Sequence, residues 1–401
     1  MVGRRIWLGL LTIAATCPIA FQAPGGAILG SANARMLLAG GPFSQQGPSF
    51  AATTQIGEAD FGNSVALSAD GNTAVVGGHG DNEETGAAWI YTRSGATWTE
   101  QAKLSTGEKL VAGYLGFDVA LSADGNTALL SGLHNGAVVF ARSDSGWAKQ
   151  GTLPGSTASV ALSADGNTAL AGEGVDAKVF TRSDGVWTEQ AQLTTTEKSG
   201  GAQFGRAVAL SSDGSTALIG GPDDYHQGAA WVFVRAGSTW HQQGGKLRVR
   251  TQRFANFGFS VALSGDASTA LIGALGAKNS HGAAWVFTRA GEAWKQQGPA
   301  LAGREEAGQG LFGFSVALTN DGGRALIGGW GDGEGAGAAW QFRRSGRVWT
   351  QQGPKLIGRR GPRRSGFGES VALSSSGSTG LIGGSGEHLG QPGAVWAFEA
   401  R

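Results

Sequence analysis

The pattern of apolar and small residues repeats seven times along the chain. Each copy contains Val-Ala-Leu, and the copies are anchored at Val65, Val119, Val160, Val208, Val261, Val316 and Val371. Successive anchors are about 40 to 55 residues apart, which is close to the length of one blade of a β-propeller. The periodicity therefore predicts a repeat fold built from seven similar units.

Each copy is predicted to contain four short β-strands, and the fifth copy shows them clearly. In residues 257–264, Val261 and Leu263 alternate with small residues, as in a strand packed among close neighbours. The next three strands are expected at residues 270–273, 283–288 and 294–301. The crowded first strand suits the innermost position, so the sequence predicts an all-β seven-bladed β-propeller of four-stranded blades.

A hairpin signal follows the first strand in most copies. Asp-Gly pairs begin at Asp70, Asp124, Asp165, Asp213 and Asp321. The glycine of each pair can adopt the positive φ that a tight turn needs. These pairs predict a short connection between the first and second strands of a blade.

The seventh copy lacks its fourth strand, because it stops at Phe398. In the other copies this strand begins with Trp. Residues 43–50 match residues 349–356 in spacing, with Phe43 in the place of Trp349. We predict that the N-terminal strand at 43–50 completes the last blade, which closes the ring and removes its open sheet edges.

The repeat resembles the FG-GAP family, the propeller type of integrin α heads and of many bacterial exported proteins. The resemblance rests on Phe61-Gly62, Phe204-Gly205, Phe257-Gly258, Phe312-Gly313 and Phe367-Gly368, and on Ile219-Gly220-Gly221-Pro222. Repeats are expected to start near residues 61, 115, 156, 204, 257, 312 and 367. The second and third depart from the pattern, with Leu115-Gly116 and Ser156-Thr157 in place of Phe-Gly.

Many FG-GAP blades carry calcium in the first hairpin, and this chain departs from the family there. A calcium ion needs about six to eight oxygen ligands. The turn at residues 68–72 offers one carboxylate, from Asp70, and one amide, from Asn72. We therefore expect turn-forming aspartates, with no metal and no cofactor.

The N-terminus has the features of an export signal. Arg4 and Arg5 precede an apolar run from residue 6 to residue 21, which is short for a membrane-spanning helix. We expect residues 1–34 to be a signal peptide and leader, and residues 35–401 to form a single propeller domain. The expected location is secreted or at the cell surface, without a membrane span. The single cysteine, Cys17, lies in the leader, so no disulfide is expected.

The charge balance argues against a nucleic-acid partner. The chain has 31 basic and 30 acidic residues, so no global field favours a polyanion. We expect a monomer whose partner is a protein or a glycan.

Candidate binding residues fall in the second and fourth connections of the blades, which strand direction places together on what we call the upper face. These connections vary in length and content, and variable loops on a rigid scaffold commonly carry binding sites. Trp330 and Tyr225 are the expected aromatic platform. The further candidates are His226, Asp332, Arg359, Arg360, Arg363 and Arg364, the arginines because they suit anionic groups.

The loop histidines are not expected to bind a metal, and the recurring tryptophans are expected to be structural. Five histidines occupy second connections, but equivalent loops on different blades are expected to be too far apart to share a metal ion. The tryptophans that recur in the third and fourth strands of the blades are expected to pack between blades.

These patterns favour a non-enzymatic binding or adhesion protein that presents a ligand surface on its upper face. The alternative is a propeller hydrolase or lyase that acts on a glycan or another extracellular polymer. The sequence contains no nucleophile elbow, no zinc-spaced His pair and no recurring carboxylate pair, so we expect no catalytic residues.

Overall fold

The structure is a computed structural model that describes residues 41–107, 113–387, 390 and 392–401. The expected signal peptide and leader at 1–34 lie outside the described residues. Within the described residues, no helix has the length and apolar character needed to cross a membrane.

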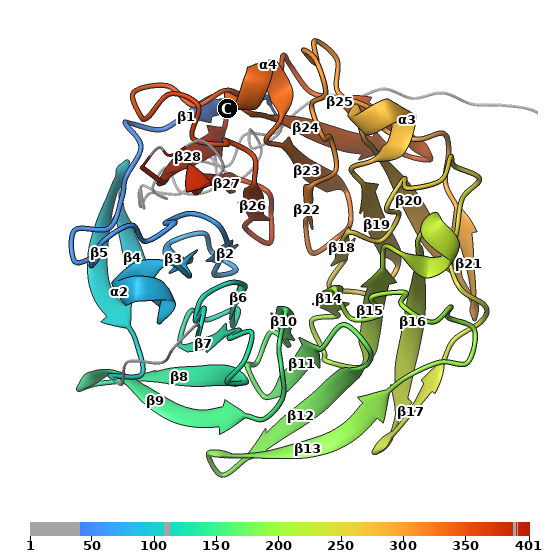
Figure 1. The fold of residues 1–401 in the computed structure, drawn as a ribbon, viewed down its shortest axis with the longest axis horizontal. Helices are drawn as coiled ribbons and strands as arrows, with labels where there is room; N and C mark the ends of the chain where they lie inside the picture. The colour runs from blue at the N-terminus through green and yellow to red at the C-terminus, as the bar shows by residue number, and fades with distance from the viewer. Residues whose placement is uncertain (1–40, 108–112, 388–389, 391) are drawn as a thin grey trace, which may run out of the picture. The chain divides into compact units, whose positions relative to one another are not determined.

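Seven four-stranded antiparallel sheets surround a central axis, so the predicted fold class is confirmed (Figure 1). In every blade the first strand lies innermost. The strands, blade by blade, are β2 (Val65–Leu67), β3 (Thr73–Gly78), β4 (Ala87–Ser94) and β5 (Thr97–Leu104); β6 (Val119–Leu121), β7 (Thr127–Leu130), β8 (Ala137–Ser143) and β9 (Gly146–Leu153); β10 (Ser159–Leu162), β11 (Thr168–Gly172), β12 (Ala177–Ser183) and β13 (Val186–Leu193); β14 (Ala207–Leu210), β15 (Thr216–Gly221), β16 (Ala229–Ala236) and β17 (Thr239–Gln242); β18 (Ser260–Leu263), β19 (Thr269–Ala274), β20 (Ala283–Ala290) and β21 (Ala293–Gln296); β22 (Ser315–Leu318), β23 (Arg324–Gly329), β24 (Ala338–Ser345) and β25 (Val348–Gln351); β26 (Ser370–Leu373), β27 (Thr379–Gly384), β28 (Ala394–Ala400) and β1 (Phe43–Gln45).

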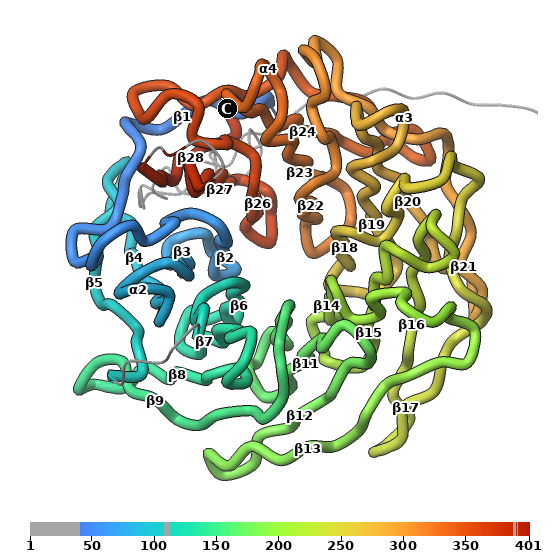
Figure 2. The backbone as a smooth tube through the Cα atoms, viewed as in Figure 1, coloured from blue at the N-terminus to red at the C-terminus, as the bar shows by residue number. Residues whose placement is uncertain are grey.

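The N-terminal strand closes the ring, as predicted. β1 pairs antiparallel with β28, in the register Phe43 to Ala400 and Gln45 to Phe398. The strand itself is shorter than expected, but an isolated bridge from Phe50 to Val395 continues the pairing. Figure 2 shows this blue N-terminal segment beside the red C-terminal one.

The core consists of hydrophobic clusters between neighbouring blades. One cluster joins the fourth and fifth blades, and another joins the seventh and first. In five blades the Phe of Phe-Gly packs against the Trp of the third strand, and Phe204 lies 5.1 Å from Trp231 between ring centroids. The equivalent pairs are Phe61 with Trp89, Phe257 with Trp285, Phe312 with Trp340 and Phe367 with Trp396.

The departures of the second and third blades have a packing explanation. Strand register places Val138 and Lys178 where the other blades have this Trp. These are the two blades without Phe-Gly, so both members of the aromatic pair are absent together. Lys178 pairs instead with Glu173 at 3.0 Å.

The tryptophans of the fourth strands link one blade to the blade before it. The indole of Trp240 donates a hydrogen bond to the side-chain oxygen of Gln190, at 2.9 Å. The same bond joins Trp187 to Gln150, Trp294 to Gln243 and Trp349 to Gln297. The prediction that the recurring tryptophans pack between blades is confirmed.

A circle of backbone hydrogen bonds surrounds the lower end of the channel. In each first hairpin, the residue after the conserved Ser or Thr donates its N–H to the equivalent carbonyl of the next blade, at 2.8 to 3.1 Å. The circle runs through Ala69, Ala123, Ala164, Ser212, Gly265, Asn320, Ser375 and back to Ala69.

The aspartates of these hairpins stabilise the turns. In the fourth blade, Ser211 and Ser215 donate hydrogen bonds to Asp213. Burial alone raises the pKa of Asp213, but these bonds and the charge of Arg235 outweigh it, so the pKa lies below its ordinary value. The pKa is lowered in the same way for Asp70, Asp124, Asp165, Asp266 and Asp321.

We predict that replacing one of these aspartates weakens the protein at neutral pH only. A carboxylate with a lowered folded pKa stabilises the fold above its unfolded pKa, and this contribution is lost as the pH falls through the folded value. Asp213→Asn should therefore cost no more than about 1 kcal/mol at pH 7, because Asp213 is exposed and screened. Urea unfolding between pH 7 and pH 2 measures the difference from wild type, which should shrink below about pH 4.

The seventh turn supplies the complementary variant, because Ser376 occupies the aspartate position there. Ser376→Asp should gain stability at neutral pH and lose that gain on acidification. A pH-independent effect in both variants would contradict the role of the carboxylate charge.

Candidate functional site

The central channel opens on the upper face into a depression of 590 Å³, a volume within the usual range for small-ligand sites. Its rim is formed by the residue that follows Phe-Gly, or its equivalent, in each blade. Apart from Ala158 in the third blade, these residues are large or polar. In blade order they are Asn63, Phe117, Ala158, Arg206, Phe259, Phe314 and Glu369. We call this depression the channel mouth.

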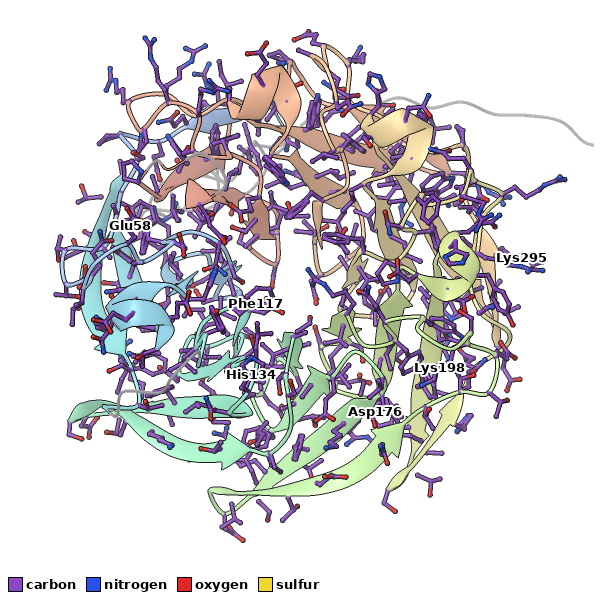
Figure 3. All side chains as sticks on the ribbon, viewed as in Figure 1. Glu58, Phe117, His134, Asp176, Lys198 and Lys295 are labelled. Atoms are coloured by element: carbon purple, nitrogen blue, oxygen red, sulfur yellow. The ribbon has the colours of Figure 1, made fainter. Side chains whose placement is uncertain are left out.

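Aromatic rings line much of the channel mouth. The ring centroids of Phe259 and Phe314 are 5.1 Å apart, and Phe314 meets the indole of Trp330 edge to face at 6.2 Å. On the other side, Phe117 lies 5.4 Å from the ring of His79. Figure 3 shows Phe117 near the centre of the ring of blades, while Lys295 lies at its outer edge.

Arg206 lies between two of these rings. Its guanidinium carbon is 4.8 Å from the centre of Phe259 and 6.0 Å from the centre of Phe117. Phe117 belongs to the second blade and Arg206 to the fourth, and the small side chain of Ala158 between them leaves room for this approach. Burial lowers the pKa of Arg206, and the negative charge of Asp118 partly offsets the effect.

Asp118 is held by the frame of the channel. Its carboxylate accepts hydrogen bonds from the hydroxyls of Ser64 and Ser159, and from the backbone N–H groups of Val119 and Val160. Burial raises its pKa against the effect of these four donors. The oxygens of Asp118 are engaged by these donors and form no ion pair with Arg206. The negative charge of Asp118 still acts on Arg206 through a longer-range electrostatic interaction.

The seventh and first blades give the channel mouth an acidic side. Glu369 accepts hydrogen bonds from the backbone and hydroxyl of Ser385. Nearby, the Nε2 atom of His79 lies 3.7 Å from carboxylate oxygens of both Asp60 and Glu387. Ligand atoms of these three residues lie within 4.8 Å of one another, a spacing at which they could hold a metal ion.

This cluster corrects one step of the sequence reasoning. We expected loops of different blades to be too far apart to share an ion, but His79 and Glu387 come from second connections of adjacent blades and meet at the channel mouth. The distance argument holds for blades across the ring and fails for neighbours.

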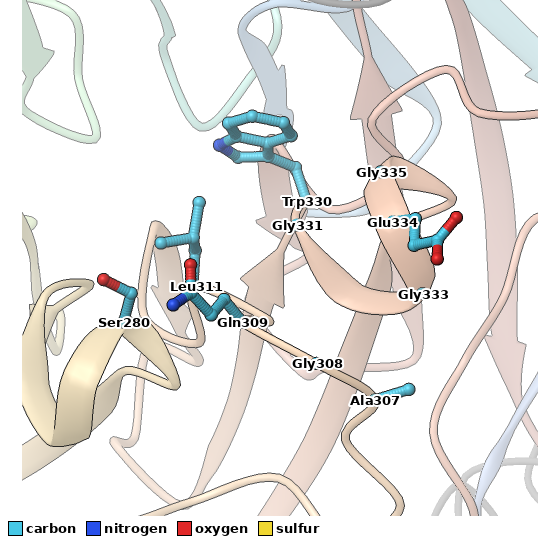
Figure 4. A pocket seen from close by; sticks show the side chains of 10 residues that line it. All are labelled: Ser280, Ala307, Gly308, Gln309, Leu311, Trp330, Gly331, Gly333, Glu334 and Gly335. Carbon is cyan, nitrogen blue, oxygen red and sulfur yellow. The ribbon is translucent and has the colours of Figure 1, made fainter.

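Trp330 borders the channel mouth and also a second depression of 740 Å³. This second depression lies between the short helices α3 (Ala277–Ser280) and α4 (Asp332–Gly335). Figure 4 shows the indole of Trp330 and the carboxylate of Glu334 pointing away from each other. His79 follows the second strand of the first blade directly, the position that Trp330 holds in the sixth blade.

Tyr225 and His226 lie apart from Trp330. They belong to the short helix η1 (Asp224–His226). Tyr225 is 66% exposed and lies under the amine of Lys246, 4.6 Å from its ring centre. The depression that Tyr225 lines does not include Trp330, so the structure does not bring the two residues into one platform.

The four arginines of the fourth connection lie exposed, outside the channel mouth. Arg359 and Arg360 line a depression of 580 Å³ beside the closing strand. The guanidinium of Arg364 donates hydrogen bonds to the backbone carbonyl of Glu334. Arg363 is exposed on the same loop.

Asp332 has a structural partner. Its side chain is buried, accepts a hydrogen bond from the backbone of Ala307 at 2.6 Å and pairs with Lys355. The first and fourth blades repeat the arrangement with Asp81 and Lys103, and Asp224 and Lys246. Asp81 lies in the short helix α2 (Asp81–Glu84). The recurrence assigns Asp332 to the scaffold of its loop.

Sequence reasoning missed the residues of the channel mouth, although a signal for them was present. The position after Phe-Gly is occupied by Asn, Arg, Phe or Glu in the five full repeats while its neighbours stay nearly constant, as in Gly205-Arg206-Ala207 and Gly258-Phe259-Ser260. The sequence-based prediction considered only the long loops and did not consider this one variable position within the constant motif.

The architecture defines the chain as a closed seven-bladed β-propeller with a lined channel mouth. A model of the FG-GAP repeat matches residues 187–233 and 252–287, which include the first two strands and most of the third strand of the fourth and fifth blades. These residues contain FG-GAP repeats, as the Phe-Gly motifs and Ile219-Gly220-Gly221-Pro222 led us to expect. No curated protein matches the chain.

We predict that Asp332 affects stability more than ligand binding. Asp332→Ala leaves Lys355 without its partner in a largely buried site and should cost about 3 kcal/mol. The double variant Asp332→Leu/Lys355→Met should recover most of this loss, because it removes both charges. Chemical denaturation measures both variants, and a single variant as stable as wild type would refute the structural assignment.

Proposed function

We propose that this protein is a non-enzymatic binding module that holds its ligand at the channel mouth of the upper face. The observation that carries the proposal is the contrast between the constant frame of the repeats and the varied residues at the rim position. Seven equivalent positions that differ in size, charge and aromaticity give a rigid scaffold one specific surface.

The chemistry of the channel mouth supports binding over a purely structural role. Phe259, Phe314 and Trp330 present aromatic surface beside a cation and several carboxylates. Aromatic and arginine side chains in a desolvated pocket are typical of binding hot spots. The apolar N-terminal run supports an exported protein that binds its protein or glycan partner outside the cell.

A glycan array and a cell-surface extract provide the test. The double variant Phe314→Ala/Trp330→Ala should bind a captured partner at least about tenfold more weakly than wild type, because two aromatic contacts are removed. The matched control is Arg359→Ala/Arg360→Ala, which changes the exposed loop outside the channel mouth and should leave binding unchanged. A partner that binds the first variant normally and the second weakly would place the site on the loop and refute the proposal.

A second candidate function, a metal-dependent hydrolase or lyase, is supported by one observation. Asp60, His79 and Glu387 offer a three-ligand set at the edge of the same depression. Catalytic zinc commonly uses three protein ligands and keeps a fourth position for water or substrate.

Zinc titration by calorimetry tests this candidate. Wild type should bind one ion, and His79→Gln should weaken it by at least about tenfold, because a ligand is lost. The exposed His226→Gln is the control and should not change zinc affinity. Absence of zinc binding, or equal turnover of glycoside and ester substrates by zinc-treated wild type and His79→Gln, would eliminate the candidate.

A further inference from the structure

We propose that the ligand of the channel mouth is an organic anion, whose carboxylate, sulfate or phosphate group pairs with Arg206 while its apolar body lies against Phe259, Phe314 and Trp330. This inference rests on the proposed binding function and specifies the chemistry of that site.

The guanidinium of Arg206 is the first reason. Among the residues that the structure describes, its contacts are the rings of Phe117 and Phe259, and it has neither a hydrogen bond nor an ion pair. A half-buried cation without a partner is unfavourable. An oxyanion that enters the channel mouth would supply the paired hydrogen bonds for which the planar guanidinium is suited.

The position of Arg206 is the second reason. Two lysines near the upper face are already paired, Lys103 with Asp81 and Lys246 with Asp224, and the arginines of residues 359–364 lie outside the channel mouth. Arg206 instead occupies the variable rim position and lines the depression itself. The two phenyl rings fix the guanidinium by cation–π contact, so it is pre-oriented for a ligand.

The wall of the channel mouth favours an apolar body over a polyhydroxylated one. The hydroxyls of Ser260, Ser315 and Ser370 donate to the carbonyls of Gly313, Gly368 and Gly62, at 2.7 to 2.8 Å. These hydroxyl groups therefore donate to structural hydrogen bonds between neighbouring blades. The surface that remains beside Arg206 is that of the aromatic rings.

The arrangement also orients the ligand. Arg206 belongs to the fourth blade, and Glu369, Glu387 and the Asp60–His79 pair belong to the seventh and first blades across the ring (Figure 1). An anionic group is attracted to the first side and repelled by the carboxylates of the other. The charged end of the ligand should therefore point toward the fourth blade.

Matched probes test the proposal by calorimetry with the full chain. 2-Naphthoate should bind wild type about tenfold more tightly than the neutral 2-naphthamide, because a charge-assisted pair with Arg206 is available only to the anion. Arg206→Met should reduce naphthoate affinity to that of naphthamide, and Arg206→Lys should retain part of the difference. Arg289→Met, at a hairpin on the opposite face, is the control and should bind like wild type.

Several results would overturn the inference. Equal affinity of wild type for naphthoate and naphthamide, or no binding of naphthoate at millimolar concentration, would refute the anion assignment. Tight binding of D-glucuronate with no binding of naphthoate would refute the apolar body. In each case, loss of partner binding in Phe314→Ala/Trp330→Ala would still support the channel mouth as the site, so the two proposals fail separately.

Discussion

The seven blades are joined to one another by the circle of backbone hydrogen bonds at the lower end of the channel. Each hairpin donates to the next, and the last bond returns from Ser375 to Ala69. A hydrogen bond from every blade to its neighbour fixes the distance between the innermost strands. The seven first strands are thereby held at one height, and so are the side chains at their upper ends.

Neighbouring blades also approach each other closely above this circle, and at some positions the backbones leave no room for a side chain. Gly258 has φ +92°, and a Cβ atom there would lie 2.3 Å from the carbonyl oxygen of Ala229 in the preceding blade. Glycine is therefore required where the first strand of one blade meets the third strand of another. The next residue points into the channel mouth and has no such restriction, so residue types as different as Arg206 and Phe259 are accommodated on one frame.

The second and third blades illustrate how a local departure from the repeat shapes the site. Both lack the aromatic pair that anchors the other blades, and the third blade presents only Ala158 at the rim. This small side chain opens the space through which Arg206 approaches Phe117. The irregular part of the ring thus gives the channel mouth its asymmetry, with Arg206 on one side and Glu369 and Glu387 on the other.

The sequence alone was enough to predict the number of blades, the four strands of each blade and the closure by the N-terminal strand. The first two features follow from local periodicity. The closure follows from the segment Phe43 to Phe50, which resembles the fourth strand that the seventh repeat lacks. The sequence also identified the Phe-Gly and Trp positions, whose packing recurs in five blades. Such features repeat along the chain, so a single sequence displays them.

The folded structure was needed to show which side chains meet. The cluster of Asp60, His79 and Glu387 joins residues from the two ends of the chain, because ring closure makes the first and seventh blades neighbours. It also separated Trp330 from Tyr225 and gave Asp332 a buried partner in Lys355. These contacts depend on the curvature of the ring and on the lengths of its loops. The repeat pattern of the sequence does not show how the ring curves or where its loops meet. The fold could therefore be predicted from the sequence, whereas the contacts at the channel mouth could not.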